Sequence, residues 1–126
     1  MFEKEITKLL NCPKIPWTKE SLKTIPQVNG VYVLSRKDKF LYVGQSRNLY
    51  DRIVNHHWTR NNSSMLKNLE IFHYKTLKES LSLDEFIKDC YIQFVEVKLG
   101  RAELEDYIIS KVDPILNNFG YKVRSL

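Results

Sequence analysis

The chain has 126 residues, of which 43% are hydrophobic and 28% charged, a balance typical of soluble globular proteins. This length predicts one domain, because two domains would each bury too little core. No apolar run reaches the roughly 18–20 residues that span a bilayer, so we expect no transmembrane helix and no membrane partner. Residues 1–5 (Met-Phe-Glu-Lys-Glu) lack the basic start and apolar run of a signal peptide, so none is expected.

Charge and cysteine content give weaker indications. Lysine and arginine total 20 and aspartate and glutamate 15, so the formal net charge is +5, which mildly favours a polyanionic partner. The two cysteines, Cys12 and Cys90, lack the spacing of metal ligands and are too few for a disulfide framework. We therefore expect a reducing, cytoplasmic environment.

The first 29 residues are interrupted by three prolines and predict an N-terminal extension that packs on or near the core. Short helices are expected over residues 3–10 and 19–23, and Thr18 is a plausible N-cap for the second. Residues 30–34 and 40–44 are rich in β-branched and aromatic side chains and flank a charged turn at 36–39, which predicts a β-hairpin.

The order of the elements predicts a small α+β domain, with a central sheet flanked by helices. Asn48 and Asp51 resemble a capping pair at a helix start. The elements that follow are, in chain order, a loop over 58–64, a helix rather than a strand over 65–78, a short helical turn over 84–88, a strand over 91–98 and a helix over 101–112.

Glu105 is unusual within the last predicted helix, because Ala102, Ile108 and Ile109 are its neighbours on the helical lattice. A carboxylate beside a core-facing stripe normally finds a cation or becomes neutral. Two interpretations stay open: a salt bridge to a basic side chain, or a ligand to a hard divalent ion.

Two further features could be structural or functional. Tyr32 and Tyr42 each lie near a glycine in the hairpin. They could be core aromatics of the two strands, or the glycines could mark the close approach of a ligand. Arg52 and His56 are spaced i, i+4 on one helix face, either solvated or able to bind phosphate and move protons. His57 has no comparable partner by spacing, so we expect it at the surface.

Together these residues resemble the GIY-YIG nuclease superfamily. The resemblance covers residues 30–117 and consists of an ordered set at family spacings: Gly30-Val31-Tyr32, Tyr42-Val43-Gly44, Arg52 eight residues after Gly44, His56 four further on, and Glu105 followed by Pro114 and Asn117. The chain departs from the family pattern at Gln45, where some members have a lysine beside the second tyrosine.

The resemblance implies an α+β fold with a small three-stranded antiparallel sheet flanked by helices, in agreement with the order of the predicted elements. It also implies an endonuclease that hydrolyses phosphodiester bonds in DNA with one Mg²⁺ or Mn²⁺ ion. Glu105 would hold the ion, Arg52 would stabilise the transition state, and Tyr32 and Tyr42 would hold the attacking water. Either a tyrosine or His56 would serve as the base, and the sequence does not rank Tyr42 above His56. Asn117 would brace the site, and Gly30 and Gly44 would support it.

DNA would be held by basic and aromatic side chains, without sequence readout. The candidates are Arg47, Trp58, Arg60, Lys67, Lys75, Lys78, Lys122 and Arg124. One such site cuts one strand at a time, so we expect a monomer or a weak homodimer. Two alternatives remain: a non-catalytic nucleic-acid-binding module on the same fold, and a purely structural or protein-interaction domain.

Overall fold

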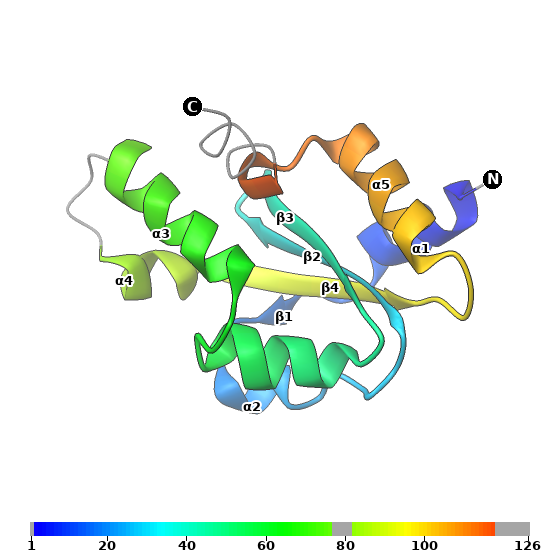
Figure 1. Cartoon of the computed structure of the whole chain (residues 1–126), viewed down its shortest axis with the longest axis horizontal. Helices are drawn as coiled ribbons and strands as arrows, with labels where there is room; N and C mark the ends of the chain where they lie inside the picture. The colour runs from blue at the N-terminus through cyan, green and yellow to red at the C-terminus, as the bar shows by residue number, and fades with distance from the viewer. Residues whose placement is uncertain (1, 77–81, 118–126) are drawn as a thin grey trace.

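The computed structural model describes residues 2–76 and 82–117. Its centre is an antiparallel sheet of four strands in the order β1-β4-β2-β3 (Figure 1). The strands are β1 (Ile15–Pro16), β2 (Gly30–Arg36), β3 (Lys39–Ser46) and β4 (Cys90–Glu96). The sequence predicted three strands; the fourth is the two-residue β1, which pairs with β4 through Ile15 and Ile92. A strand this short, containing a proline, carries too little periodicity to be recognised in sequence.

The predicted hairpin is confirmed, and its register sets the geometry of the site. Strands β2 and β3 pair so that Tyr32 lies opposite Gly44 and Leu34 opposite Tyr42. A register shift between Leu34 and Ser35 marks an irregularity near the turn. Strand β2 lies between β3 and β4 in the sheet, and it pairs along its whole length with β4 as well.

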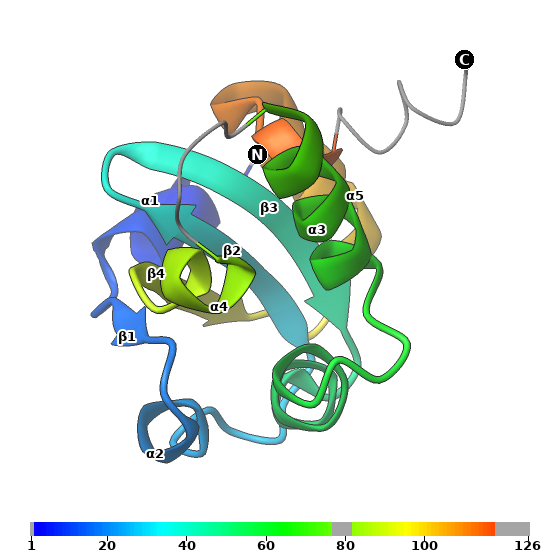
Figure 2. The same ribbon diagram turned by 90° about the vertical axis from the view of Figure 1, so that its left-hand side faces the viewer.

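Helices cover both faces of the sheet (Figure 2). They are α1 (Glu3–Asn11), α2 (Lys19–Leu22), η1 (Asp51–Trp58), α3 (Ser64–Thr76), α4 (Leu83–Ile87) and α5 (Arg101–Val112). The last helix has the predicted bounds, and residues 65–76 are helical, as favoured over a strand. The described part of the chain contains no helix of the length and apolarity that crossing a membrane requires. The model confirms the α+β class.

The alternation of side chains along β2 divides the core into two clusters. Val31 and Val33 face one cluster, which includes Leu9 of α1 and Leu104 and Ile108 of α5. Tyr32 and Leu34 face the other cluster, which the remaining helices cover; among its members are Leu49, Ile53, Met65, Leu69, Phe86 and Leu116. The first tyrosine of the hairpin is therefore a core residue on the face covered by η1.

The helix after the hairpin has an unexpected geometry. Asn48 caps its start as predicted, since the Asp51 N–H donates to Asn48 Oδ1 at 3.0 Å. The helix then continues as a π-helix from Asp51 to Trp58, in which residues five apart, rather than four, close each turn. In Figure 2 this coil is seen nearly end-on below the sheet. The change in winding alters which side chains of η1 face the sheet.

Candidate active site

Tyr32 is fixed by a close approach to Gly44. Its side chain is 1% exposed, and a Cβ placed on residue 44 would lie only 2.3 Å from its Cζ and Oη atoms. The phenol ring therefore crosses the space that any other side chain at position 44 would fill. Burial is the main reason that the pKa of Tyr32 lies well above its usual value; the neighbouring Tyr42 and the negative charge of Glu105 add to the rise, while Arg52 opposes it.

A buried chain of hydrogen bonds extends from Tyr32 through η1 to the next loop. Tyr32 Oη lies 2.5 Å from His57 Nε2, and His57 Nδ1 lies 2.6 Å from Ser63 Oγ. The Leu66 N–H donates to the same Ser63 oxygen at 3.0 Å, which fixes the serine at the start of α3. Neutral imidazole has one N–H, so His57 donates to one of its two neighbours and accepts from the other.

The expectation that His57 lies at the surface is wrong, because its side chain is 1% exposed and bonded at both nitrogens. Burial, with the charges of Arg52 and His56, lowers the pKa of His57 to about 3. The physical reason for the error is the winding of η1. In an α-helix, residues four apart such as Arg52 and His56 lie on one face. In a π-helix, residues five apart lie on one face, and His57 is five residues after Arg52.

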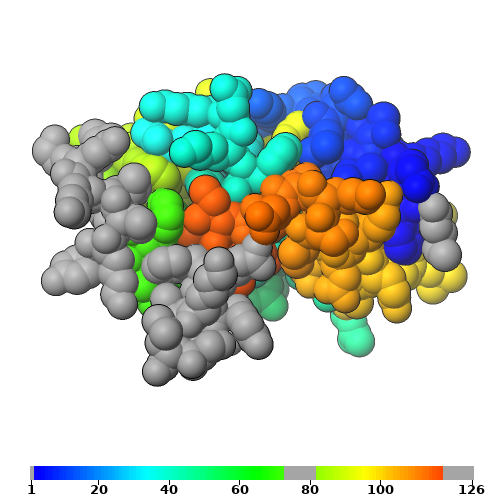
Figure 3. All heavy atoms as spheres, turned by 90° about the horizontal axis from the view of Figure 1, so that it is seen from above, coloured from blue at the N-terminus to red at the C-terminus, as the bar shows by residue number. Residues whose placement is uncertain are grey.

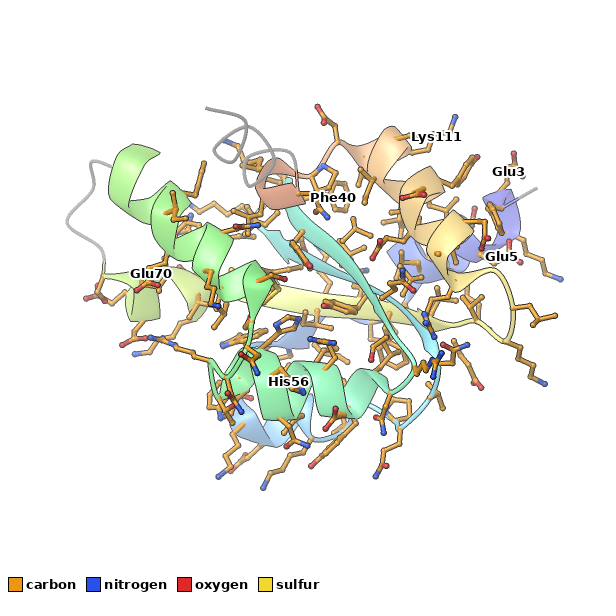
Figure 4. All side chains as sticks on the ribbon, in the orientation of Figure 1. Glu3, Glu5, Phe40, His56, Glu70 and Lys111 are labelled. Atoms are coloured by element: carbon orange, nitrogen blue, oxygen red, sulfur yellow. The ribbon has the colours of Figure 1, made fainter. Side chains whose placement is uncertain are left out.

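His56 also lies on η1 (Figure 4), but it is not part of the hydrogen-bond chain that joins Tyr32, His57 and Ser63. Its Nδ1 is 3.0 Å from the Asn61 carbonyl oxygen, and its Nε2 is 3.4 Å from Asp51 Oδ2. Its side chain is 27% exposed. Within the described residues, no hydrogen bond or ring contact joins His56 to either tyrosine, so the model does not bring this predicted residue to the phenols.

Tyr42 is the more accessible of the two phenols. Its ring centroid is 6.2 Å from that of Tyr32 and 6.3 Å from that of His57. On balance the pKa of Tyr42 is raised, because burial and the charge of Glu105 outweigh the effects of Ser64, Arg52 and Tyr32, which act in the opposite direction. The proximity of the two phenols raises the pKa of Tyr32 and lowers that of Tyr42, so it favours the anion on Tyr42.

Arg52 is the cation of this group. Its positive charge lowers the pKa values of both phenols and of His57, so all three lie within its electrostatic reach. Its side chain is partly exposed and makes no ion pair or side-chain hydrogen bond with any residue that the model describes. A guanidinium with free donors beside two phenols is suited to bind a phosphate.

Glu105 approaches the group from α5. Its carboxylate is partly buried, and this burial, followed by the charge of Asp106, raises its pKa. A hydrogen bond from Gln45 and the charge of Arg101 act against that rise. The Arg101 Nε–H donates to Gln45 Oε1, and the other end of the guanidinium donates to Asn29 Oδ1. Arg101 thus places a cation beside Gln45.

Asn117 and Gly30 support the strands that carry the phenols. The Val43 N–H donates to Asn117 Oδ1 at 2.8 Å, and Asn117 Nδ2 donates to the Val43 carbonyl at 2.9 Å. The amide side chain thereby pairs with the outer edge of β3 as a neighbouring strand would. Figure 3 shows the segment before residue 118 between the β2–β3 hairpin and α5. At Gly30, a Cβ would lie 2.3 Å from the Val95 carbonyl oxygen and would separate β2 from β4.

The predicted DNA contacts differ in their exposure and in their partners. Arg47 and Lys67 are exposed, whereas Arg60 forms an ion pair with Asp84 and Trp58 is partly buried against Trp17. The side chain of Lys75 and all of Lys78, Lys122 and Arg124 lie outside the described residues.

The family model of the GIY-YIG catalytic domain matches residues 28–121. The chain belongs to the GIY-YIG family. The predicted resemblance is thereby confirmed, and no curated protein matches the chain significantly in sequence.

Solved structures share the fold of this GIY-YIG chain. The N-terminal endonuclease domain of UvrC from Thermotoga maritima, bound to magnesium as its catalytic divalent cation, is 16% identical with a TM-score of 0.54. The match covers 78% of this chain and 92% of that one. A point mutant of the same domain, also bound to its catalytic cation, is 16% identical with a TM-score of 0.52, covering 78% and 91% of the two chains.

The site offers one carboxylate, that of Glu105, as a ligand for a hard divalent ion. Among the described residues, no group of three or more His, Cys, Asp or Glu side chains is placed so that it could hold a metal ion by itself. Magnesium commonly keeps several waters and takes only one or two protein carboxylates, completing its shell with substrate phosphate. Glu105 is a partly buried anion with a second carboxylate, Asp106, nearby, so a cation at this position would relieve an unfavourable charge.

Proposed function

We propose that this GIY-YIG chain is a divalent-metal-dependent endonuclease that hydrolyses phosphodiester bonds in DNA. The observation that carries the proposal is the convergence of Tyr32, Tyr42, Arg52 and Glu105. They come from β2, β3, η1 and α5, yet the charges of Arg52 and Glu105 both act on both phenols. A phosphoryl-transfer site needs these parts: a cation for the phosphate, a carboxylate for a metal and groups that hold water.

Arg52 binds the scissile phosphate in this proposal. Its two terminal nitrogens can donate to two non-bridging oxygens at once, and it stabilises the charge that builds up on them in the transition state. The same charge favours ionisation of Tyr42, since Arg52 lowers the pKa of that phenol. One side chain thus stabilises the phosphate and tunes the base.

Tyr42 is the base that we favour. The hydrogen-bond chain can be ordered so that every donor points toward it. Ser63 Oγ–H donates to His57 Nδ1 and His57 Nε2–H donates to Tyr32 Oη, which leaves the Tyr32 proton directed toward Tyr42. In this order His57 stays neutral, as its low pKa of about 3 requires. The chain behind Tyr42 would stabilise its phenolate form, and this phenolate takes the proton of the attacking water to become a neutral phenol.

Glu105 would hold the metal ion, Mg²⁺ or Mn²⁺, with Gln45 and Arg101 orienting its carboxylate. When bound, the ion supplies positive charge at the phosphate and at the leaving oxygen. Arg47 and Lys67 are exposed cations that would contact DNA phosphates elsewhere. The two free cysteines, Cys12 and Cys90, fit a reducing cytoplasm.

The test is incubation of the full chain with supercoiled plasmid in Mg²⁺, in Mn²⁺ or in EDTA. We expect nicked plasmid only with metal, no cleavage by Glu105→Gln, and full cleavage by Glu103→Gln, which changes an exposed carboxylate on the same helix. Glu105→Gln should keep the melting temperature and DNA affinity. Full activity in Glu105→Gln would refute the metal assignment, and DNA binding without cleavage under every condition would support the non-catalytic alternative.

A further inference from the structure

An open pocket of about 680 Å³ lies between α2, the last residue of η1 and α4. Both tryptophans of the chain line it, Trp17 before α2 and Trp58 at the end of η1. Their ring centroids are 6.1 Å apart with the planes tilted by 44°. Trp17 is buried and Trp58 is partly exposed, so Trp58 presents the ring that a ligand can reach. The volume lies within the range of about 300–1,000 Å³ typical of ligand sites.

The rim of this pocket is positively charged. Lys19, Arg60 and Lys88 line it against the single carboxylate of Asp84, which leaves a net charge of +2. Arg60 is paired with Asp84, and their side chains are 49% and 68% exposed. The two lysines that line the pocket, Lys19 and Lys88, are exposed. An anion with an attached apolar or aromatic group complements this surface.

A nucleotide combines these properties, because its base stacks on an aromatic ring while its phosphate meets a cation. In a duplex the faces of the bases are covered by their neighbours, so only an unpaired nucleotide can stack in the pocket. We infer that this pocket binds an unpaired nucleotide of the DNA strand on which the active site acts, an inference that rests on the proposed function.

The position of the pocket relative to Arg52 supports this inference. Trp58 follows Arg52 by six residues on the same helix, η1, so the pocket and the cation proposed to bind the scissile phosphate lie along one helix. Residues 17–19 precede the segment that matches the family model, so this wall of the pocket is built outside the matched domain.

The placement of the tryptophans makes the pocket directly observable. Because both line it, quenching of the intrinsic tryptophan fluorescence reports on the pocket. The titration uses a single-stranded oligothymidine and a blunt duplex of the same length, without metal. We expect the single strand to quench the fluorescence, and the duplex to bind with little quenching.

Matched variants separate stacking from general charge. Trp58→Leu keeps apolar bulk but loses the aromatic face, so its affinity for the single strand should fall about 5- to 150-fold, while Trp58→Phe should lose much less. Asp84→Asn frees Arg60 and should raise affinity about 1.5- to 5-fold. Lys111→Gln removes a charge on α5, at the opposite end of the molecule (Figure 4), and serves as the control. Melting temperatures show whether each variant is folded.

The outcomes distinguish this inference from the proposed function. If Trp58→Leu is folded and binds the single strand as tightly as the unchanged chain, or if the single strand causes no quenching, the pocket assignment is wrong. A forked duplex should also be cut faster than a blunt duplex in Mg²⁺, and equal rates would count against the pocket. Quenching by the single strand without cleavage of any DNA would refute the proposed function and leave the pocket assignment standing.

Discussion

Replacing His57 should change how the stability of the protein depends on pH. The pKa of His57 falls to about 3 in the folded chain, against 6.5 for an exposed histidine, because the ring is buried among Tyr32, Tyr42 and the positive charge of Arg52. Between these two values the unfolded chain binds a proton at residue 57 that the folded chain does not. The free energy of unfolding therefore falls as the pH falls from 6.5 toward 3.

The magnitude follows from the pKa difference. Each pH unit within this window is worth about 1.4 kcal/mol, so lowering the pH to 4.5 removes about 3 kcal/mol. That loss is large against the typical total stability of about 5–15 kcal/mol. His57→Gln cannot take up this proton, and its stability should lack this contribution. At neutral pH the variant should be weaker by about 1–3 kcal/mol, because Ser63 or Tyr32 loses a buried partner.

Urea unfolding at several pH values between 4.5 and 7.5 measures this difference. Other groups, such as Asp51, whose pKa is lowered by a hydrogen bond from Asn55, titrate in both proteins and cancel in the comparison. His56→Gln is the matched control, since it removes a partly exposed histidine and should keep the steep dependence. Equal pH dependence in His57→Gln and the unchanged chain would show that His57 is not buried and neutral.

Three further substitutions test the site. Arg52→Lys keeps the charge but loses the planar guanidinium, so single-turnover cleavage should fall roughly 100- to 1,000-fold with an unchanged melting temperature, whereas a solvated arginine would tolerate the change. Gly44→Ala places a methyl group 2.3 Å from Tyr32 and should cost about 1–3 kcal/mol in urea unfolding, partly regained with Tyr32→Leu; full stability of the single variant would contradict this packing. Asn117→Asp removes the N–H donor to the Val43 carbonyl and should lower the unfolding free energy by about 1–3 kcal/mol, and an unchanged melting temperature would exclude this role for the amide.

The sequence predicted the elements whose patterns are local. The hairpin strands, the Asn48 and Thr18 caps and the last helix follow from side-chain periodicity and capping residues. The two tyrosines and Arg52 could be located because signature spacing within one hairpin and one helix start fixes them. The two-residue strand β1 could not, since its pairing with β4 depends on contacts far along the chain.

The part of the site that sequence reasoning missed depends on winding and on long-range contacts. His57 was missed because an i, i+4 pattern assumes an α-helix, and nothing in residues 51–58 indicates a π-helix beforehand. Arg101 was missed because its partner Gln45 lies 56 residues away. The sequence did contain one signal for Arg101. Gln45 stands where the family pattern allows a lysine, which indicates that another residue could supply the missing positive charge.

The adjacent histidines on η1 have a consequence for how this chain is compared with its relatives. A helix that gains or loses one residue changes between π and α winding, and the side chain that faces the sheet then moves by one position. The chain has histidine at both 56 and 57, so a shift by one position would exchange one imidazole for the other. Such a doublet would let the helix tolerate insertion or deletion of a residue without losing the group. An alignment of this family that permits no gap within the helix would then pair residues that are equivalent in sequence but not in space.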